Sequence, residues 1–289
     1  MTPTVPSLSI GMPVFNGARY IRRALESLLN QTYSDFELIV SDNASTDGTI
    51  EILREISKGD ARVSYSQNES NIGALGNFRR VLQMARGQYF MWAAADDEWD
   101  RRWVEVLLSN FRPGTSVSFG TVTNIDDQGG IVRRYADFRY PNSKVARLLK
   151  YFWDDDFEGK ANLIYGIYER SRLLDAGVPD DYAGIPFVDM HFVFNQLERG
   201  SIVTDPAVCL YKRISQVSSI PRKPWSRLAT VLGADRETLR YLVAYPRLLH
   251  DPIAKGAVYA LLPARIAKRL AIGATNGIVA LWKRSGLDV

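Results

Sequence analysis

The stretch LIVSDNASTDGT, residues 38–49, joins a short apolar run to a polar loop. Residues 36–40 have the apolar continuity of a buried strand, and residues 41–48 are types that form turns and cap helices. Apolar side chains then recur at the spacing of one helix face. The segment therefore predicts a strand, a loop that begins at Asp42, and a helix at about residues 48–58.

The same order of strand, polar loop and helix continues on both sides of this stretch. We expect strands at residues 8–15, 63–66 and 88–93, and helices at residues 18–30 and 74–86. This alternation predicts an α/β fold with a mainly parallel sheet and helices on both faces. Right-handed crossovers would bring the carboxyl ends of the strands to one edge, where open α/β sheets bind ligands.

The rest of the chain is less regular. We expect strands at residues 116–122, 131–135, 161–168 and 201–213, and helices at residues 143–153, 170–176 and 187–199. From about Trp225 to the end the pattern is helical, with many apolar and basic residues. The sequence thus predicts a first domain over residues 1–220, made of halves at 1–100 and 101–220, and a helical extension over residues 221–289.

The composition limits the classes of function. A chain of 289 residues with 46% hydrophobic residues can bury a core, and its net charge of +4 is not a nucleic-acid-binding composition. The single cysteine excludes an intramolecular disulfide, and two distant histidines make a zinc site of the usual kind improbable. The first residues lack the basic and apolar regions of a signal peptide, so we expect a cytoplasmic protein.

Carboxylates follow two of the expected strands. The loop after the first strand lacks the glycine patterns of dinucleotide sites and of P-loops. Asp42 could accept hydrogen bonds from a base or ribose, or it could cap the next helix. Asp96 and Asp97 repel each other unless water or a cation neutralises them, so they suit Mg²⁺ or Mn²⁺ on a diphosphate, or a solvated helix cap.

Asp189 lies among large apolar residues. A carboxylate in such surroundings tends towards a raised pKa and can act as a general base, although it could also bond to the first amides of a helix. We expect His191 to be a packed or hydrogen-bonded side chain. The run of aspartates at residues 154–156 predicts a solvated loop.

Four ordered stretches of the first hundred residues resemble glycosyltransferase family 2, whose members adopt the GT-A fold. They are SIGMPVFNG at residues 9–17, LIVSDNASTDGT at residues 38–49, NIGALGN at residues 71–77, and GQYFMWAAADD at residues 87–97, the position of the family's D-x-D element. The resemblance implies an inverting transferase that uses a nucleotide-sugar donor and a divalent cation, Mg²⁺ or Mn²⁺.

The resemblance also implies roles for individual residues. The nucleotide pocket would be lined by Pro13, Phe15 and Asn16, and the base would be held by Asp42. The nucleotide and its ribose would be bordered by Asn71, Gly73 and Asn77. Asp96 would be the principal metal ligand on the donor diphosphate, with Asp97 beside it. Asp189 would deprotonate the acceptor hydroxyl.

Three positions depart from the family pattern. Ala94 replaces the first aspartate of the D-x-D element, Val188 replaces the glutamate of a Glu-Asp pair, and Ser215 replaces the histidine of a Y-R-x-H segment. The first change removes one contact to ribose or metal. The third weakens the expectation of metal or phosphate contacts near Ser215.

The predicted function is transfer of a sugar to a hydroxyl of a saccharide or lipid-linked acceptor, in bacterial cell-surface polysaccharide or glycolipid synthesis. Two rivals are a nucleotidyltransferase, which the first loop disfavours because it lacks Gly and Lys/Arg enrichment, and a catalytically silent sugar-nucleotide-binding protein. Residues 252–284 alternate apolar stretches with basic residues. These residues predict one of two arrangements. The first is a pair of interfacial helices that bind the anionic inner face of the cell membrane. The second is helices that pack on the first domain or on the other subunit of a homodimer.

Overall fold

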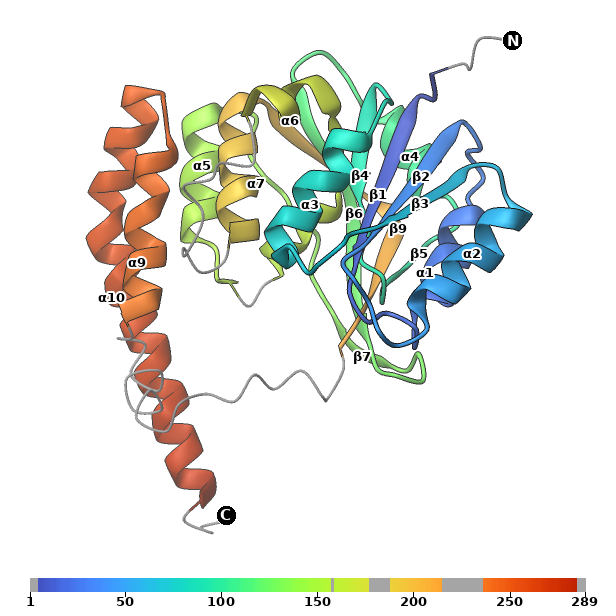
Figure 1. Ribbon diagram of the computed structural model, residues 1–289. Helices are drawn as coiled ribbons and strands as arrows, with labels where there is room; N and C mark the ends of the chain where they lie inside the picture. Colours follow the sequence, from blue (N-terminus) through green and yellow to red (C-terminus); the bar gives the residue numbers. More distant parts are fainter. Residues whose placement is uncertain (1–4, 157–158, 177–187, 215–235, 285–289) are drawn as a thin grey trace.

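A computed structural model describes residues 5–156, 159–176, 188–214 and 236–284. For residues 236–238 and 273–284 it describes only the backbone. The expected boundary at residue 220 lies outside these ranges. The described chain is a mixed α/β structure, as the sequence predicts, with a twisted sheet in the middle and a layer of helices beside it (Figure 1).

Four parallel strands form the first part of the sheet. They are β1 (Leu8–Val14), β2 (Phe36–Asp42), β3 (Val63–Gln67) and β4 (Tyr89–Trp92), and they lie side by side in the order β3-β2-β1-β4. All residues of β2 are buried, which explains its apolar run Leu38–Val40; the buried Glu37 is paired with Ser9 and Arg86.

Helices cover both faces of these strands, as expected. α1 (Ile21–Leu29) and α2 (Thr49–Gly59) lie on one face, and α3 (Gly73–Met84) lies on the other (Figure 1). Consecutive side chains of β4 point to opposite faces of the sheet. The indole Nε1 of Trp92 donates to the carbonyl of Phe78 on α3. Met91 lies on the other face, where its Sδ accepts the indole N–H of Trp103 in α4 (Trp103–Ser109).

The sheet continues through five more strands. They are β5 (Glu98–Trp99), β6 (Thr115–Ile125), β7 (Ile131–Arg134), β8 (Ile167–Glu169) and β9 (Ser201–Arg213). β8 is antiparallel to both β4 and β6, so β6 runs parallel to β4; β9 in turn is parallel to β6. The carboxyl ends of β6 and β9 therefore reach the same edge as those of β1 to β4. This edge collects the loops that carry the candidate site.

The expected strand at residues 161–168 is only partly correct. Residues Lys160–Tyr165 form a 3-10 helix, η2, and only Ile167–Glu169 form a strand. Gly159 precedes η2 with a φ of 81°, a left-handed conformation that starts a tight turn. The phenol of Tyr168 then donates to the carbonyl of Leu163 at 2.6 Å. An apolar run of this length does not distinguish a strand from a buried helical turn, and the tertiary packing decides between them.

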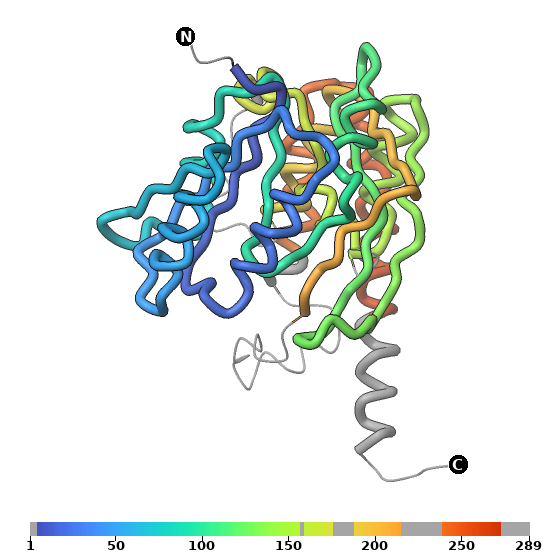
Figure 2. The backbone as a smooth tube through the Cα atoms, turned by 90° about the vertical axis from the view of Figure 1, so that its right-hand side faces the viewer, coloured from blue at the N-terminus to red at the C-terminus, as the bar shows by residue number. Residues whose placement is uncertain are grey.

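The helical layer contains segments from distant parts of the chain. It comprises α5 (Lys144–Trp153), α6 (Arg170–Ala176), α7 (Val188–Arg199), α9 (Arg236–Ala244), η4 (Tyr245–Leu248) and α10 (Pro252–Arg284). α10 is one continuous helix, so the expected pair of helices over residues 252–284 is wrong. Pro263 lies inside α10 on its exposed side. α10 lies against α5, α9 and η4, and these C-terminal helices lie on the side of the molecule away from β1 to β3 (Figures 1 and 2).

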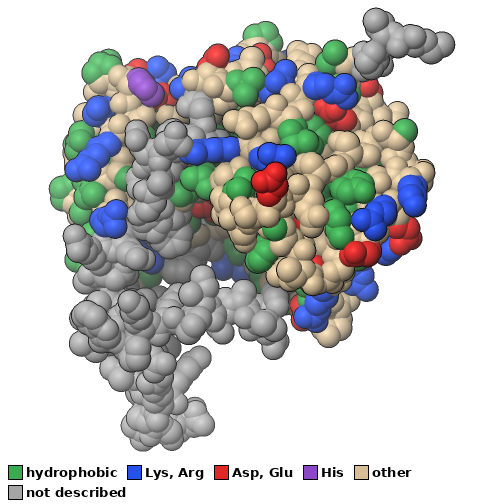
Figure 3. Space-filling view, in the orientation of Figure 1, with side chains coloured by type: hydrophobic (Ala, Val, Ile, Leu, Met, Phe, Trp, Pro, Cys, Tyr) green, Lys and Arg blue, Asp and Glu red, His purple; other side chains and the backbone are tan. Residues whose placement is uncertain are grey.

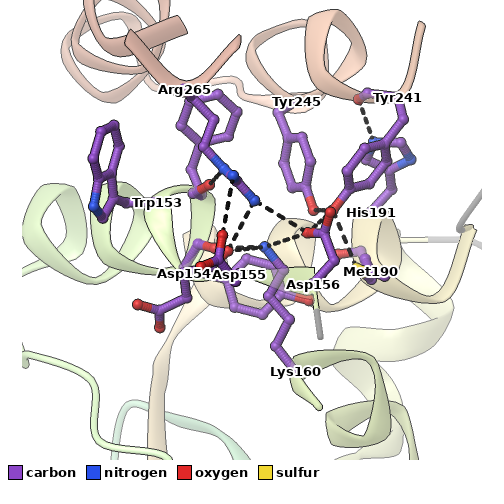
Figure 4. A network of polar contacts seen from close by, with 12 residues as sticks. Trp153, Asp154, Asp155, Asp156, Lys160, Met190, His191, Tyr241, Tyr245 and Arg265 are labelled. Carbon is purple, nitrogen blue, oxygen red and sulfur yellow. Dashed lines mark hydrogen bonds and ion pairs between the residues drawn. The ribbon is translucent and has the colours of Figure 1, made fainter. Parts of the chain in front are cut away.

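The aspartates at residues 154–156 do not form a solvated loop, which corrects the expectation. Asp156 accepts hydrogen bonds from Tyr241 of α9 at 2.9 Å, and it pairs with Lys160 at 3.0 Å and with Arg265 of α10 at 3.3 Å (Figure 4). Arg265 and Lys160 are fully buried. Because Arg265 comes from a helix more than a hundred residues away, the sequence pattern could not indicate this network.

The same network reaches α7. The hydroxyl oxygen of Tyr241 lies 3.1 Å from Met190 Sδ, and the carbonyl of Tyr241 bonds to His191 Nε2 at 2.9 Å (Figure 4). His191 is buried, as expected of a packed histidine. Among the residues that the structure describes, no helix has both the length and the apolar content that a membrane crossing requires.

Candidate active site

Asp42 ends β2 and is fully buried. Its Oδ2 accepts hydrogen bonds from Gln67 Nε2 at 2.9 Å and from the backbone N–H of Ser45 at 3.2 Å. Its Oδ1 is buried with no hydrogen-bond partner in the described residues. A buried carboxylate oxygen without a hydrogen bond is unfavourable unless a ligand donates to it. Oδ2 of Asp42 therefore stabilises the loop, and Oδ1 is left to accept a hydrogen bond from a ligand.

Amide side chains hold the next loops together. Asn43 donates to Asn71 Oδ1 at 2.8 Å, and Asn68 donates to Asn43 Oδ1 at 3.0 Å and to Asn77 Oδ1 at 3.2 Å. Asn77 also donates to the carbonyl of Ser41 at 2.8 Å. Asn77 is buried and Asn71 is exposed. Asn71 is therefore open to a ligand, whereas Asn77 shapes the site from below.

The remaining residues expected in the nucleotide pocket lie at the same edge. Gly73 begins α3 with a φ of 78°, and a Cβ there would meet nothing, so its glycine is needed for the backbone conformation. Asn16 has a φ of 52° and accepts the backbone N–H of Thr46 at 2.9 Å, which joins the loops after β1 and β2. Pro13 is half-buried, and Phe15 is 51% exposed.

Asp96 and Asp97 follow β4 but have unlike surroundings. The side chain of Asp96 is exposed, whereas Asp97 is buried. Oδ1 of Asp97 accepts the backbone N–H of Arg213 at 2.8 Å. The guanidinium of Arg213 also donates to the carbonyl of Asp96 at 3.2 Å and pairs with Glu98. Arg213 thus fixes this loop to the end of β9 and leaves the Asp96 carboxylate free to face solvent.

Lys212 stands beside the pair. Its Nζ lies 3.9 Å from Asp97 Oδ2 and 5.0 Å from the ring centre of Tyr165. Burial would lower the pKa of Lys212, but Tyr165, Asp97, Asp96 and Asp189 together raise it above its ordinary range. Burial raises the pKa of Asp97 to about 7, against the opposing charge of Lys212. Lys212 is therefore an ammonium ion among the candidate acidic residues.

Asp189 begins α7, where its Oδ1 accepts the backbone N–H of Met190 at 2.9 Å. Burial raises the pKa of this carboxyl above its usual range, and the charge of Lys212 lowers it in part. Lys212 is near enough to act electrostatically on Asp189 as well as on Asp96 and Asp97. A carboxylate with a raised pKa in such a place is suited to accept a proton.

The residues present fit a divalent cation shared with a diphosphate. Within the described ranges, no group of three or more His, Cys, Asp or Glu side chains forms a closed metal site. Asp96 is exposed, and Asp97 Oδ2 has no hydrogen-bond partner in the part of the chain that the structure describes. Mg²⁺ commonly binds proteins through one or two carboxylates and takes its other ligands from phosphates and water. This pair supplies that number of carboxylates.

Sequence reasoning did not assign Lys212, Arg213, Asn43 or Asn68 to the site. Lys212 and Arg213 lie in the segment that resembles Y-R-x-H. Two basic residues in that segment could have indicated that they belong to the site. Asn43 and Asn68 follow β2 and β3 directly, and the order of strand and polar loop could have indicated them. Their partners became evident only when the loops were brought together.

The model of the family described as glycosyl transferase family 2 matches residues 9–169, more than half of the chain. The fold and the order of side chains along its ligand edge agree with this match. The chain belongs to glycosyltransferase family 2.

Relatives of described function share parts of the chain. The chain is 37% identical over 131 residues to the chondroitin synthase of Escherichia coli, which covers 44% of this chain and 19% of that protein. It is 29% identical over 182 residues to the GalNAc(5)-diNAcBac-PP-undecaprenol beta-1,3-glucosyltransferase of Campylobacter jejuni, covering 62% of this chain and 57% of that enzyme. The chain thus spans less than two thirds of the length of these curated relatives.

A solved structure shares the fold over nearly all of the chain. The mannosyltransferase PcManGT from Pyrobaculum calidifontis, in complex with GDP-Man and Mn²⁺, has a TM-score of 0.60 at 15% identity and covers 99% of this chain and 77% of its own. At this identity the likeness shows the GT-A fold alone.

Proposed function

We propose that this chain transfers a sugar from a nucleoside-diphosphate donor to a hydroxyl of a saccharide or lipid-linked acceptor, in bacterial cell-surface polysaccharide or glycolipid synthesis. One observation supports the proposal: the loops with Asp42 and Asn71 and the Asp96–Asp97 pair follow strands whose carboxyl ends lie at one sheet edge, and Lys212 acts electrostatically on both this pair and the buried carboxylate of Asp189. The names of the relatives, which include an undecaprenol-linked acceptor, support the class of acceptor.

The proposed donor site follows from the geometry of the first loops. Asp42 would accept a donor group of the base or ribose, and the exposed Asn71 would border the nucleotide, with Pro13, Phe15 and Asn16 along the pocket. Mg²⁺ or Mn²⁺ would be held by Asp96, with Asp97 beside it, and would neutralise charge on the diphosphate.

The proposed reaction is a single displacement that inverts the anomeric carbon. The acceptor oxygen forms a bond to that carbon as its proton passes to the Asp189 carboxylate, and the bond from the carbon to the phosphate oxygen breaks with its electron pair. The raised pKa of Asp189 supports its assignment as the base, because a stronger base accepts the proton more readily.

Purified protein should first be tested for hydrolysis of UDP-, dTDP- and GDP-sugars and for transfer to saccharide and polyprenol-diphosphate acceptors. An Asp189→Asn variant should lose transfer by about 10²-fold or more, the scale of general base catalysis. Asp175→Asn, an exposed aspartate on α6, is the matched control. Full transfer by Asp189→Asn would refute the assigned base, and donor binding without hydrolysis or transfer would favour a silent sugar-nucleotide-binding protein.

Membrane contact through α10 is a further part of the proposal. The exposed positions of its described side chains carry no charge: Pro252, Ile253, Gly256, Tyr259, Ala260, Pro263, Ala264, Ala267, Leu270 and Ala271. Residues 252–284 include six basic residues and no acidic ones. Green and blue side chains predominate on the corresponding left-hand part of Figure 3. An uncharged stripe on a purely basic helix is complementary to an anionic bilayer surface.

Co-sedimentation with vesicles tests this contact. The full chain should bind vesicles rich in phosphatidylglycerol and not vesicles of phosphatidylcholine. Replacing Ile253 and Tyr259 with Glu should abolish binding, whereas Val132→Glu, at an equally exposed apolar position on β7, should not. Binding that survives the Ile253 and Tyr259 changes would overturn the assignment, and a dimer that dissociates in the same variant would indicate a protein partner instead.

A further inference from the structure

Met190, the residue that follows Asp189 on α7, contacts three separate parts of the molecule. Its backbone N–H donates to Asp189 Oδ1 at 2.9 Å. Its carbonyl accepts the hydroxyl of Tyr151 on α5 at 3.1 Å, and its Sδ lies 3.1 Å from the hydroxyl oxygen of Tyr241 on α9. Met190 and both tyrosines are buried. The backbone that carries the Asp189 carboxylate is therefore held from α5 and from α9.

Tyr241 holds the first turn of α7 with its backbone as well as its side chain. Its carbonyl lies 2.9 Å from His191 Nε2, and its ring centre lies 5.0 Å from that of His191. Its hydroxyl donates to Asp156 at 2.9 Å, on the side away from His191 (Figure 4). One residue of α9 thus contacts the two residues that follow Asp189.

The fully buried Arg265 of α10 fixes the partner of Tyr241. Its guanidinium pairs with Asp156 at 3.3 Å, and Lys160 pairs with the same carboxylate at 3.0 Å. A buried carboxylate with several charged and hydrogen-bonding partners has little freedom to move, so it holds the Tyr241 hydroxyl in turn. A continuous series of contacts therefore leads from α10 to the residue beside Asp189.

A general base works only from a narrow range of positions. Its carboxylate must come within hydrogen-bond reach of the acceptor hydroxyl, and a small displacement lowers the rate steeply. Asp189 is also close enough to the network to be affected by its charge: burial raises the pKa of Asp189, and the charge of Asp156 adds to the rise. A change in the network should therefore reach the candidate base.

We propose that Tyr241 and Tyr151 are positioning residues for Asp189, and that α9 and α10 thereby complete the candidate active site from the C-terminal part of the chain. The inference rests on the proposed function, in which Asp189 takes the acceptor proton. The two hydroxyls keep Met190 in place, and the Met190 N–H keeps the carboxylate in the orientation that receives the proton.

A double-mutant cycle in the full chain tests this role, with the donor among the UDP-, dTDP- and GDP-sugars that supports transfer. Turnover is expressed per donor-binding site, counted by calorimetry. Tyr241→Phe should lower turnover by about 10-fold or more and leave the KM for the donor unchanged. In an Asp189→Asn background the same change should lower the residual turnover by less than about 2-fold, because the base that it positions is gone.

Two further variants complete the comparison. Tyr151→Phe removes the other hydroxyl on Met190, and it should show the same loss of turnover and the same dependence on Asp189. Tyr168→Phe is the matched control, because this buried tyrosine donates to the carbonyl of Leu163 instead. Its turnover should equal that of the wild type.

The two backgrounds separate a positioning role from a purely structural one. A tyrosine that only stabilises the fold would lower turnover by the same factor with and without the Asp189 carboxylate. Equal factors in both backgrounds, or Tyr241→Phe and Tyr151→Phe proteins as active as Tyr168→Phe, would overturn the inference while the proposed function stands. Full transfer by Asp189→Asn, or no transfer by the wild type, would overturn the proposed function and this inference with it.

Discussion

Asp156 and Asp97 are both largely buried aspartates with a lysine nearby. They lie in two regions that differ in how many charged and hydrogen-bonding partners surround the carboxylate. Asp156, beneath the C-terminal helices, is contacted by Lys160 at 3.0 Å, Tyr241 at 2.9 Å and Arg265 at 3.3 Å. At the ligand edge, the partners of Asp97 among the described residues are one backbone N–H and a lysine 3.9 Å away.

The pKa values follow these contacts. Burial alone would raise the pKa of Asp156, but Lys160, Arg265 and Tyr241 lower it below its usual range. Burial raises the pKa of Asp97 to about 7 because its partners are too few to compensate. A fully paired cluster holds elements together, and an incompletely paired one at a loop edge leaves interactions for a ligand.

The largest expected change in stability comes from disrupting the cluster of Asp156, Lys160 and Arg265. Asp156→Asn leaves the buried charges of Lys160 and Arg265 without their shared carboxylate, so the free energy of unfolding should fall by about 3 kcal/mol. Denaturant titration followed by tryptophan fluorescence measures it. Asp175→Asn, at an exposed position, should change the value by less than about 0.5 kcal/mol. A loss for Asp156→Asn no larger than this control would contradict the comparison.

Acid should act on the same region through His191. Burial lowers the pKa of this histidine to about 4, below its ordinary value of 6.5. The unfolded chain therefore binds more protons than the folded chain between pH 6.5 and 4, and the histidine makes stability fall as the pH falls through that window. The loss should reach about 3 kcal/mol. A His191→Gln variant should show a shallower decline between pH 7 and 4, and identical slopes would refute this origin.

The smallest change in stability is expected at the incompletely paired cluster. Asp97→Asn keeps the acceptor for the Arg213 N–H and removes a carboxylate that burial disfavours, so the free energy of unfolding should change by less than about 1 kcal/mol. Because 31% of the Lys212 side chain is exposed, water can solvate its ammonium when this partner is lost. Denaturant titration of the variant would measure the change, and a large loss of stability would show that the two regions are alike.

The first hundred residues were predictable because their information is local. Most strands of this half are rich in apolar residues, the loops contain turn and capping residues, and the parallel order places Asp42 and Asp96 at one edge. The roles of these residues and of Asp189 remain proposals that the experiments above test.

Tertiary contacts decided the parts that the sequence pattern did not predict. The sequence pattern of the aspartates at residues 154–156 predicts a solvated loop, but in the fold Arg265 of α10 packs against them. Residues 160–165 form a 3-10 helix that begins with the buried Lys160. Lys212 became a site residue only when the parallel pairing of β9 with β6 carried it to the edge shared with Asp97.

The sequence by itself determined the alternation of strands and helices, the carboxylates at the strand ends and the resemblance to a family of transferases, because periodicity and short motifs need only neighbours along the chain. The tertiary structure alone decided which buried aspartates are fully paired. That distinction depends on charged partners that are more than a hundred residues away, such as Arg265 for Asp156 and Lys212 for Asp97, and on how completely the fold removes them from water.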